Sequence, residues 1–558
     1  MANGSNKNIF RQVYLGVLIF IAVSLPLSRS TMTQGMILLL ALWLWSDFQI
    51  SVAVRFFRQK GVFRGFFLFM KYLWALAKES AVEKTALFFQ NKPAVVFASI
   101  YLLGLAGLFF TGDFPQATHS LRIKLPLLLF PLVFSSFPPI TSRELRKLML
   151  FYTAALLAGT LIGSYKIFWG TYVDVREFSP FISPVRFGLN ITFGVLTLVY
   201  FIARDRSFSG WQKIFMGAMA VWFVWFLIKM ESVTSLSLLF LLFLGLLLYR
   251  GIQTKKRAII ALSFAVVVLV PAGTFFYVQH EVRQMIRVPD GVQLQTTEKT
   301  AEGHAYTFDT THYGIEDGRY VGAYLCLPEL KKAWNKRSAI PFSGKDKNGN
   351  PLQTTLIRYM TSKDLRKDAQ GVSRLTDKDI ENIENGVANM HYVDHPGLHS
   401  RLLVMVKGWQ VYRKTGKAGG SSVFQRLEYL HAALRVIQNN FWTGVGTGDL
   451  IHALGYQYTQ LHSGMDEYVG FLSHNQYLDT FAAYGVFGFL WFLFALVYPA
   501  VKTRSFNDYF FVVFYAIMLL SMLSDDTMET HAGITLFSFF LSLFMFGKEK
   551  QGKEVKEG

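Results

Sequence analysis

FLSHNQYLDTFAAYGVFGFL, residues 471–490, places a polar His474–Asn475 pair directly before an apolar segment of helical length. An imidazole exchanges protons near neutral pH, because its ordinary pKa is about 6.5. The residues after the pair are apolar enough to lie in a lipid bilayer. On the helix that follows, His474 and Tyr477 share one face, and Asn475 and Asp479 form an adjacent i,i+4 pair. The stretch predicts a reactive histidine at a membrane surface, with Asn475 and Tyr477 as supporting residues.

The composition of the whole chain is that of a polytopic membrane protein. Of the 558 residues, 52% are hydrophobic and 16% aromatic, whereas only 17% are charged. Soluble enzymes carry more charge and less apolar surface. The formal net charge of +19 would suit nucleic-acid binding, but the Lys and Arg residues fall between apolar segments. We therefore expect no nucleic-acid partner. The single Cys326 excludes an intrachain disulfide.

About twelve apolar stretches are long enough to cross a hydrocarbon core of about 30 Å. The predicted fold is an all-α polytopic membrane protein with about 12 transmembrane helices and one large, mostly helical polar loop. The predicted spans are 10–27, 34–54, 93–111, 125–140, 148–169, 187–203, 214–230, 233–249, 258–278, 477–499, 509–523 and 533–546.

The Lys and Arg residues in the short connections predict the orientation of these spans. With twelve spans, the basic connections and the basic tail 548–558 all fall on one side, which the positive-inside rule assigns to the cytoplasm. Both termini are then cytoplasmic. The chain divides into a membrane domain 1–279, an extracytoplasmic loop 280–471 and a second membrane part 472–547. The basic side chains also favour contact with anionic membrane lipid.

Residues 55–92 mix basic residues with Phe, Leu and Trp at helical spacing. This pattern predicts an amphipathic helix at the membrane interface. Its simplest role is a cytoplasmic anchor, and the alternative is a role in presenting a lipid-linked substrate.

Three helices are predicted in the long polar loop. Thr376 with Asp379 forms a capping-box pattern, Ser400 is placed to cap a helix that ends at Gly416, and Ser422 opens a third helix.

Three arginines are candidates for an anion site. Arg186 lies at the outer end of the sixth predicted span, where the positive-inside rule disfavours it. It either snorkels to the interface or binds an anion, since a guanidinium matches phosphate with a fork of donors. Arg426 lies in the first turn of a predicted helix, where the helix dipole disfavours a cation unless an anion binds there. Otherwise it is a solvated surface residue. Arg401 is a similar candidate.

Two further motifs suggest binding sites but have simpler interpretations. GVGTGDL, residues 444–450, is rich in glycine, but no strand precedes it and the spacing of a nucleotide-binding loop is missing. A flexible turn with N–H groups that could meet an anion is the better interpretation. Asp525, Asp526, Glu529 and His531 could suggest a metal site. A solvated outer loop that tunes the site electrostatically is the preferred interpretation, so we expect no metal.

The segments RLEYLHAALRVIQNNFWTGVGTGD (426–449) and SHNQYLDTFAAYGVFGFL (473–490), together with the predicted topology, resemble the O-antigen ligase and polymerase superfamily of bacterial envelopes. The resemblance implies a metal-independent, inverting glycosyltransferase of the GT-C type, without a cofactor, in the bacterial inner membrane. Its active site would lie on the periplasmic face. The implied donor is a glycan on undecaprenyl diphosphate, and the favoured acceptor is lipid A–core.

The resemblance also implies roles for individual residues. His474 matches the family histidine before the tenth span and would act as the base, while Arg186 and Arg426 match arginines that would bind the diphosphate. The motif is shared by O-antigen polymerases and by protein O-oligosaccharyltransferases, so a glycan or protein acceptor stays open. A non-catalytic glycan-lipid transporter is the remaining alternative. Transporters favour charged residues at mid-bilayer, and the apolar spans here have few of them.

Overall fold

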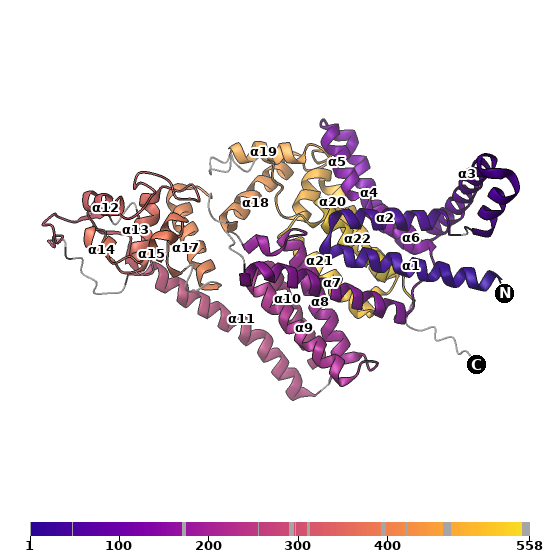
Figure 1. Ribbon diagram of the computed structural model, residues 1–558, viewed down its shortest axis with the longest axis horizontal. Coiled ribbons are helices and arrows are strands. Elements are labelled where there is room, and N and C mark those ends of the chain that lie inside the picture. The colour runs from indigo at the N-terminus through magenta and orange to yellow at the C-terminus, as the bar shows by residue number, and fades with distance from the viewer. Residues whose placement is uncertain are drawn as a thin grey trace. The chain divides into compact units, whose positions relative to one another are not determined.

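The computed structural model describes residues 2–46, 48, 50–169, 175–254, 256–288, 295, 297–309, 313–391, 398–418, 422–460 and 470–549 (Figure 1). The chain forms two compact units. Unit 1 consists of Met1–Leu246, Tyr429–Leu461 and Asp466–Gly558, and unit 2 consists of Leu247–Glu428 and His462–Met465.

Unit 1 is helical throughout its described residues. Its first half contains α1 (Ala2–Leu27), α2 (Arg29–Leu44), α3 (Ile50–Gln90), α4 (Lys92–Ala106), η1 (Gly107–Phe110), α5 (Phe114–Lys124), α6 (Pro126–Ser136), α7 (Ser142–Trp169), η2 (Val175–Phe178), α8 (Pro184–Arg204), α9 (Gly210–Lys229) and most of α10 (Val233–Gln253). Its second half contains the end of α18 (Ser422–Asn439), α19 (Leu450–Gln460), α20 (Gln476–Lys502), η4 (Ser505–Asn507), α21 (Tyr509–Ser521), η5 (Thr527–Glu529) and α22 (His531–Phe546).

The chain is a multi-pass, predominantly helical membrane protein, and it departs from the all-α prediction only in short strands of unit 2 among the described residues. Within the described residues, nine helical segments are long and apolar enough to cross a membrane. The predicted span 34–54 overlaps α2, of 16 residues, and the first residues of α3. The predicted spans 509–523 and 533–546 coincide with the shorter helices α21 and α22, of 13 and 16 residues. The prediction of about twelve spans rests on the number of apolar runs. An apolar run that is interrupted, or that other helices enclose, need not form a helix with the length of a full membrane span.

The short helix α22 is enclosed by other helices of unit 1. All its positions from Ala532 to Met545 are buried, because α6, α21 and neighbouring helices pack around it. Phe540 packs edge-on against Phe193 of α8 and Tyr152 of α7, with ring centroids 5.1 Å apart in each pair. A helix that is apolar on every side is typical of a position enclosed by protein as well as of a membrane span.

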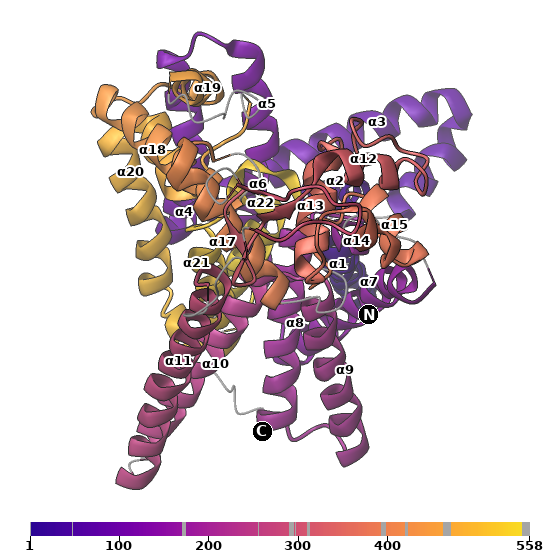
Figure 2. The same cartoon turned by 90° about the vertical axis from the view of Figure 1, so that its left-hand side faces the viewer.

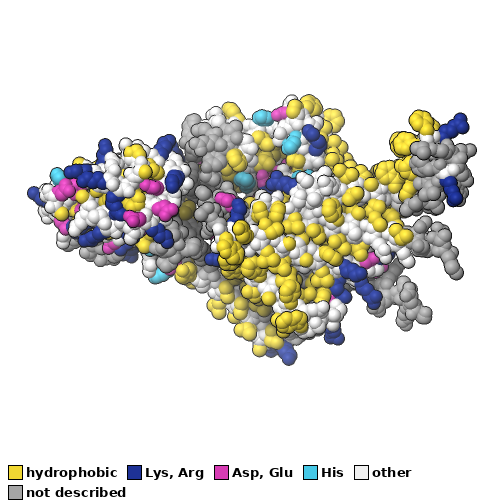
Figure 3. Space-filling view, in the orientation of Figure 1, with side chains coloured by type: hydrophobic (Ala, Val, Ile, Leu, Met, Phe, Trp, Pro, Cys, Tyr) yellow, Lys and Arg dark blue, Asp and Glu magenta, His cyan; other side chains and the backbone are white. Residues whose placement is uncertain are grey.

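The outer surface of unit 1 agrees with a lipid environment. Ile214, Val221 and Ile228 of α9 recur every two turns and are 64%, 71% and 53% exposed. Figure 3 shows hydrophobic side chains covering much of the visible surface of this unit, with the basic side chains gathered mainly at its margins. Apolar surface on this scale would be unfavourable in water, so these faces contact lipid.

The segment predicted to be amphipathic is the long helix α3. It covers residues 50–90, which confirms a helix across most of the predicted region. Its exposed side chains include Phe63, Phe67 and Trp74, which are 92%, 71% and 75% exposed. Near the other end of this helix Lys84 is buried, and its ammonium group donates to the hydroxyls of Ser46 and Ser80, 2.6 Å from each oxygen.

Helix α20 runs beside α4 and is broken at Gly485 (Figures 1 and 2). Gly485 has φ +64° and ψ −172°, which is far from helical geometry. The break frees backbone groups that pair with the preceding turn: Val445 N donates to Ala482 O and Gly446 N donates to Ala483 O. Breaks of this kind are tolerated inside membrane proteins only where other protein groups satisfy the backbone. Gly485 therefore marks a backbone junction between α20 and the turn that contains Val445 and Gly446.

Gly485→Ala is expected to destabilise the protein strongly. A Cβ at this position would lie 2.2 Å from the backbone oxygen of Trp442, and the positive φ alone costs about 1–3 kcal/mol for a non-glycine residue. The measurement is the thermal unfolding midpoint of the purified protein in detergent. Gly16→Ala in α1 is the control, because nothing lies within 4 Å of its added Cβ. Equal unfolding midpoints for the two variants would contradict the requirement for glycine at this backbone junction.

Unit 2 has a separate core and two small sheets. Its elements are the end of α10, α11 (Arg257–Ile286), β1 (Thr307–Asp309), β2 (Ile315–Glu316), β3 (Arg319–Tyr320), β4 (Gly322–Leu325), α12 (Leu327–Trp334), α13 (Leu352–Ser362), α14 (Ala369–Ser373), α15 (Asp377–Glu384), α17 (Leu398–Thr415) and the start of α18. β1 pairs with β4 and β2 with β3, both antiparallel. The core includes the fully buried Trp334, Leu356 and Met360.

The helix boundaries in unit 2 match the sequence patterns closely. The capping box is confirmed, because the amide of Asp379 donates to the Thr376 hydroxyl and the amide of Thr376 donates to the Asp379 carboxylate. α18 starts at Ser422 as predicted, and α17 ends at Thr415, directly before the predicted end at Gly416. The predicted cap at Ser400 is wrong, because α17 starts at Leu398 and includes Ser400.

Candidate functional site

His474 lies in a tight connection just before α20. Its φ of +54° is left-handed, so His474 is not part of the helix, and the expected shared helix face with Tyr477 is wrong. Asn475 is the N-cap, and its side-chain oxygen accepts from the amides of Tyr477 and Leu478 at 3.1 Å. The amide of Ser473 donates to the buried carboxylate of Asp479 at 3.1 Å. These bonds hold the backbone on both sides of His474 in place.

The start of α20 is also fixed to α21 and to the segment that follows it. The Asn475 side-chain amide donates to Leu523 O at 3.0 Å, and the Tyr477 hydroxyl donates to Leu519 O at 2.9 Å. Gln476 is completely buried, accepts from the amide of Met528 at 2.7 Å and donates to Glu529 at 3.1 Å. Of the two predicted supporting residues, Asn475 thus caps the helix directly after the histidine, whereas Tyr477 connects α20 to α21.

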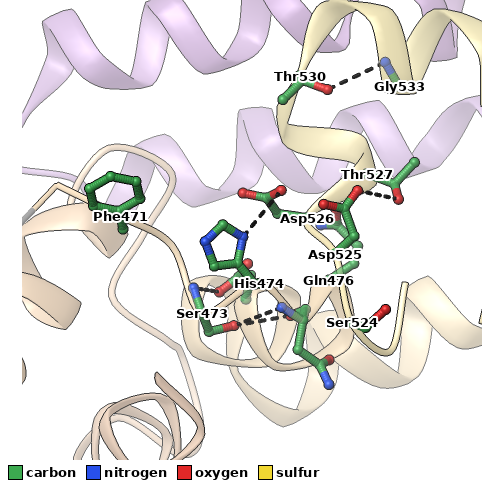
Figure 4. Close-up of polar contacts among 12 residues, drawn as sticks. Phe471, Ser473, His474, Gln476, Ser524, Asp525, Asp526, Thr527, Thr530 and Gly533 are labelled. Atoms are coloured by element: carbon green, nitrogen blue, oxygen red, sulfur yellow. Dashed lines mark hydrogen bonds and ion pairs between the residues drawn. The ribbon is translucent and has the colours of Figure 1, made fainter. Parts of the chain in front are cut away.

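Arg186 and His474 meet at the same carboxylate. Arg186 lies in the first turn of α8, which begins at Pro184, a residue suited to a first helical position. Its Nη2 atom is 2.9 Å from Asp526 Oδ1 and 3.1 Å from Asp525 Oδ2. The Nδ1 atom of His474 is 3.8 Å from the same Asp526 Oδ1, and Figure 4 shows the imidazole facing Asp526.

The two carboxylates of this cluster are not solvated. Asp525 is only 4% exposed, so the expectation of a solvated outer loop is wrong for this residue. Burial raises the pKa of Asp525, although Arg186 acts against that change. Burial acts on Asp526 as well, but the His474 imidazole and the Arg186 guanidinium outweigh it and hold the pKa of Asp526 below its usual range. Asp526 therefore holds its negative charge more readily than Asp525 does, and it faces both His474 and Arg186.

Aromatic rings surround the imidazole on other sides. The ring of Tyr429 is edge-on to His474, with centroids 5.2 Å apart, and the ring of Phe471 lies 6.4 Å away. The His474 side chain is 33% exposed. It is thus packed on several sides and still accessible to another molecule, which a histidine needs if it is to exchange a proton with a substrate.

His474, Asp525 and Asp526 also bring possible metal-ligand atoms within 4.8 Å of one another. The guanidinium of Arg186 already lies within 3.1 Å of both carboxylates. A cation bound by the same oxygen atoms would have to displace this guanidinium or be repelled by it. The arrangement therefore fits an ion-pair cluster better than a metal centre.

The sequence analysis missed a second buried ion pair beside this cluster. Lys124 at the end of α5 lies 2.7 Å from Glu529, and both side chains are largely buried. Glu529 also accepts from Gln476, so the pair is connected to the start of α20. A lysine directly before the apolar run LPLLLF was the available signal, because charged residues within membrane segments are rare and usually paired.

The glycine-rich turn 444–449 is not an anion cradle. Its amides are used internally: Gly444 N donates to Asn440 O, and Thr447 N and Gly448 N donate to the segment 107–111. The carboxylate of Asp449 accepts from the amides of Gly112 and Asp113. The turn therefore joins α18, α20 and the α4–α5 connection, and the amides of residues 444–448 are already bonded to these segments instead of being free to meet an anion.

The other two predicted arginines belong to unit 2. Arg426 lies near the start of α18 with an exposed side chain. Arg401 lies in α17, and its side chain is outside the described residues. Of the three arginines, only Arg186 lies in the compact unit that contains His474.

The region around His474 also carries a family signature. Residues 376–493 match the family model for O-antigen ligase. The resemblance to the O-antigen ligase superfamily is thereby confirmed, and the match supports a glycan-transfer function of the ligase or polymerase type in a membrane. No curated protein matches the chain. The O-antigen ligase match includes Arg426, Asn475 and His474, whereas Arg186, Asp525 and Asp526 lie outside its residues.

Proposed function

We propose that this protein transfers a glycan from undecaprenyl diphosphate to an acceptor hydroxyl, with lipid A–core as the favoured acceptor. The observation that carries the proposal is the position of His474. It lies within the O-antigen ligase match, before a membrane helix, and faces the Asp526–Arg186 ion pair. An accessible histidine beside an ionised carboxylate is suited to take a proton from a hydroxyl.

In the proposed reaction, the acceptor hydroxyl attacks the anomeric carbon of the donor glycan. The new bond forms between the acceptor oxygen and this carbon, while the bond from the carbon to the diphosphate oxygen breaks with its electron pair. His474 takes the proton of the attacking hydroxyl. Its Nδ1 faces Asp526, so Nε2 is the nitrogen left for the acceptor, and Asp526 stabilises the imidazolium that forms. Attack opposite the diphosphate inverts the anomeric configuration.

The diphosphate leaves as an anion and needs positive charge nearby. The Nε atom of Arg186 is buried and has no hydrogen-bond partner among the described residues, which supports a role as a donor to a bound anion. We assign the same role to Arg426, whose side chain is exposed. Charge-assisted hydrogen bonds contribute about 1.5–3 kcal/mol each. Two of them would stabilise the leaving group without a metal ion or a cofactor.

A second candidate function differs only in the acceptor. O-antigen polymerases and protein O-oligosaccharyltransferases would use the same donor and the same base with a glycan or protein hydroxyl. The observation that favours keeping this candidate is the core of unit 2 around Trp334 and Leu356, which lies before the first matched residue, 376. This additional folded segment would suit recognition of a different acceptor. We further propose that the site faces the periplasm and that both termini are cytoplasmic.

The decisive experiment is a transfer assay with the purified full-length protein. Undecaprenyl-diphosphate glycan is mixed separately with lipid A–core, with a second lipid-linked glycan and with a protein acceptor. The expected result is transfer to one acceptor together with release of undecaprenyl diphosphate, unaffected by a metal chelator. A different result would show that the protein is a transporter and not an enzyme. In that case no acceptor would lead to release of undecaprenyl diphosphate, although the same preparation moves the glycan-lipid across vesicle membranes. Loss of activity with the chelator would contradict metal independence.

A further inference from the structure

A polar cavity of about 330 Å³ lies at the end of α20 that is remote from His474. Three cationic side chains line it, namely Lys502 at the end of α20, Arg504 two residues later and Lys548 after α22. Phe544 and Met545 of α22 supply apolar lining. The volume is sufficient for several water molecules or for one hydrated anionic group.

The charges in this cavity are not balanced by its own carboxylate. Asp508 is the acidic lining residue, and it is already bound to Lys548 and to the amide of Phe511. Lys502 and Arg504 form no ion pair among the residues that the structure describes. Lys502 lies 6.0 Å from the ring of Tyr498, a weak contact for a cation. Three cations against one carboxylate leave an excess of positive charge.

The local backbone holds these groups around the cavity. Arg504 has φ +56°, an unfavourable conformation for a non-glycine residue, and it connects α20 to η4. The Thr503 hydroxyl donates to Pro499 O, 2.7 Å away, which secures the end of the helix. The dipole of α20 alone could attract cations to this end, but it would not require them to surround a cavity.

We propose that this cavity binds a phosphate group, as found in the head group of an anionic phospholipid or in free phosphate. Arginine and lysine are the usual ligands of phosphate, and basic pockets at the ends of membrane helices recognise lipid head groups. The exposed Val501 and Phe506, 55% and 45% exposed, flank the cationic lining along the chain and would contact the adjoining acyl chains of a lipid. The proposal is independent of glycan transfer.

The test measures the thermal unfolding midpoint of the full-length protein in detergent during titration with phosphatidylglycerol. A ligand that binds only the folded state raises this midpoint. The wild type is expected to reach half of the maximal shift at a lipid concentration about tenfold lower than the Lys502→Gln/Arg504→Gln variant, since the variant loses two charge-assisted contacts. Inorganic phosphate is titrated in parallel, and phosphatidylethanolamine serves as the zwitterionic comparison.

Arg206→Gln is the matched control, because Arg206 is an exposed arginine in the α8–α9 connection and does not line the cavity. The Arg206→Gln variant is expected to show the same midpoint shift as the wild type at each lipid concentration. Should the double variant not purify, Arg504→Gln alone replaces it. A variant-sensitive shift with phosphatidylglycerol supports a lipid, and one with inorganic phosphate alone supports a soluble ligand. Two results would contradict the proposed site. One is an identical midpoint titration of the wild type and the cavity variants, and the other is a loss of lipid response in Arg206→Gln equal to that in the cavity variants.

Discussion

His474→Ala is expected to reduce glycan transfer by about 10²–10⁴-fold, the usual contribution of a general base. The variant retains the N-cap at Asn475 and the bond from Ser473 to Asp479, because neither uses the imidazole. The protein should therefore fold and insert normally. The measurement is the rate of undecaprenyl diphosphate release in the transfer assay, together with the thermal midpoint of the same preparation.

His452→Ala provides the matched control for this result. His452 is also a histidine beside an aspartate in unit 1, with its Nε2 atom 2.8 Å from Asp113, and its side chain is 67% exposed. Its loss should leave transfer unchanged. Comparable transfer by His474→Ala and the wild type would show that His474 is not the general base. Equal losses of transfer in both histidine variants would point to a general effect of removing exposed imidazoles.

Arg186→Met is expected to lower stability by about 3–5 kcal/mol, because it leaves the buried carboxylates of Asp525 and Asp526 without their cation. The loss arises mainly from unpaired buried charge and only secondarily from packing, since methionine keeps much of the apolar stem. Thermal unfolding in detergent measures it. An unchanged midpoint would mean that the guanidinium is not needed to compensate these carboxylates.

Arg186→Met/Asp525→Asn separates the structural role of Arg186 from its proposed role at the diphosphate. The second substitution removes one buried negative charge, while Asp526 keeps its contact with His474. Stability should recover in part. If Arg186 stabilises the leaving group, transfer stays low in this stable variant. If transfer returns together with stability, Arg186 serves only to neutralise the acids, and its assignment to the diphosphate is wrong.

The sequence located the centre of the candidate site but not its carboxylates. His474 was recognisable because a titratable residue precedes an apolar helix, and Arg186 because a cation lies at an unexpected end of a span. The bond between Arg186 and Asp526 joins residues 340 positions apart. Helical periodicity carries no information on which connections meet over such distances, so Asp525 and Asp526 were interpreted as a solvated loop.

The fold class followed from hydropathy, whereas the details of single helices did not. Apolar runs identified the membrane helices, but they did not predict that protein would enclose α22 on all sides. Gly485 illustrates a different limit. Glycine in an apolar helix indicates close contact in general, and only the pairing of Val445 and Gly446 with the carbonyls before the break identifies a backbone junction.

The backbone of His474 makes the candidate site a compromise between stability and activity. A left-handed conformation costs a non-glycine residue about 1–2 kcal/mol, a cost that glycine does not bear. Glycine at position 474 would thus give a more stable protein that lacks the imidazole. Selection for thermal robustness alone would drive this position toward glycine, and selection for glycan transfer would retain histidine. Deep mutational scanning under the two selections would therefore favour opposite residues at one and the same position.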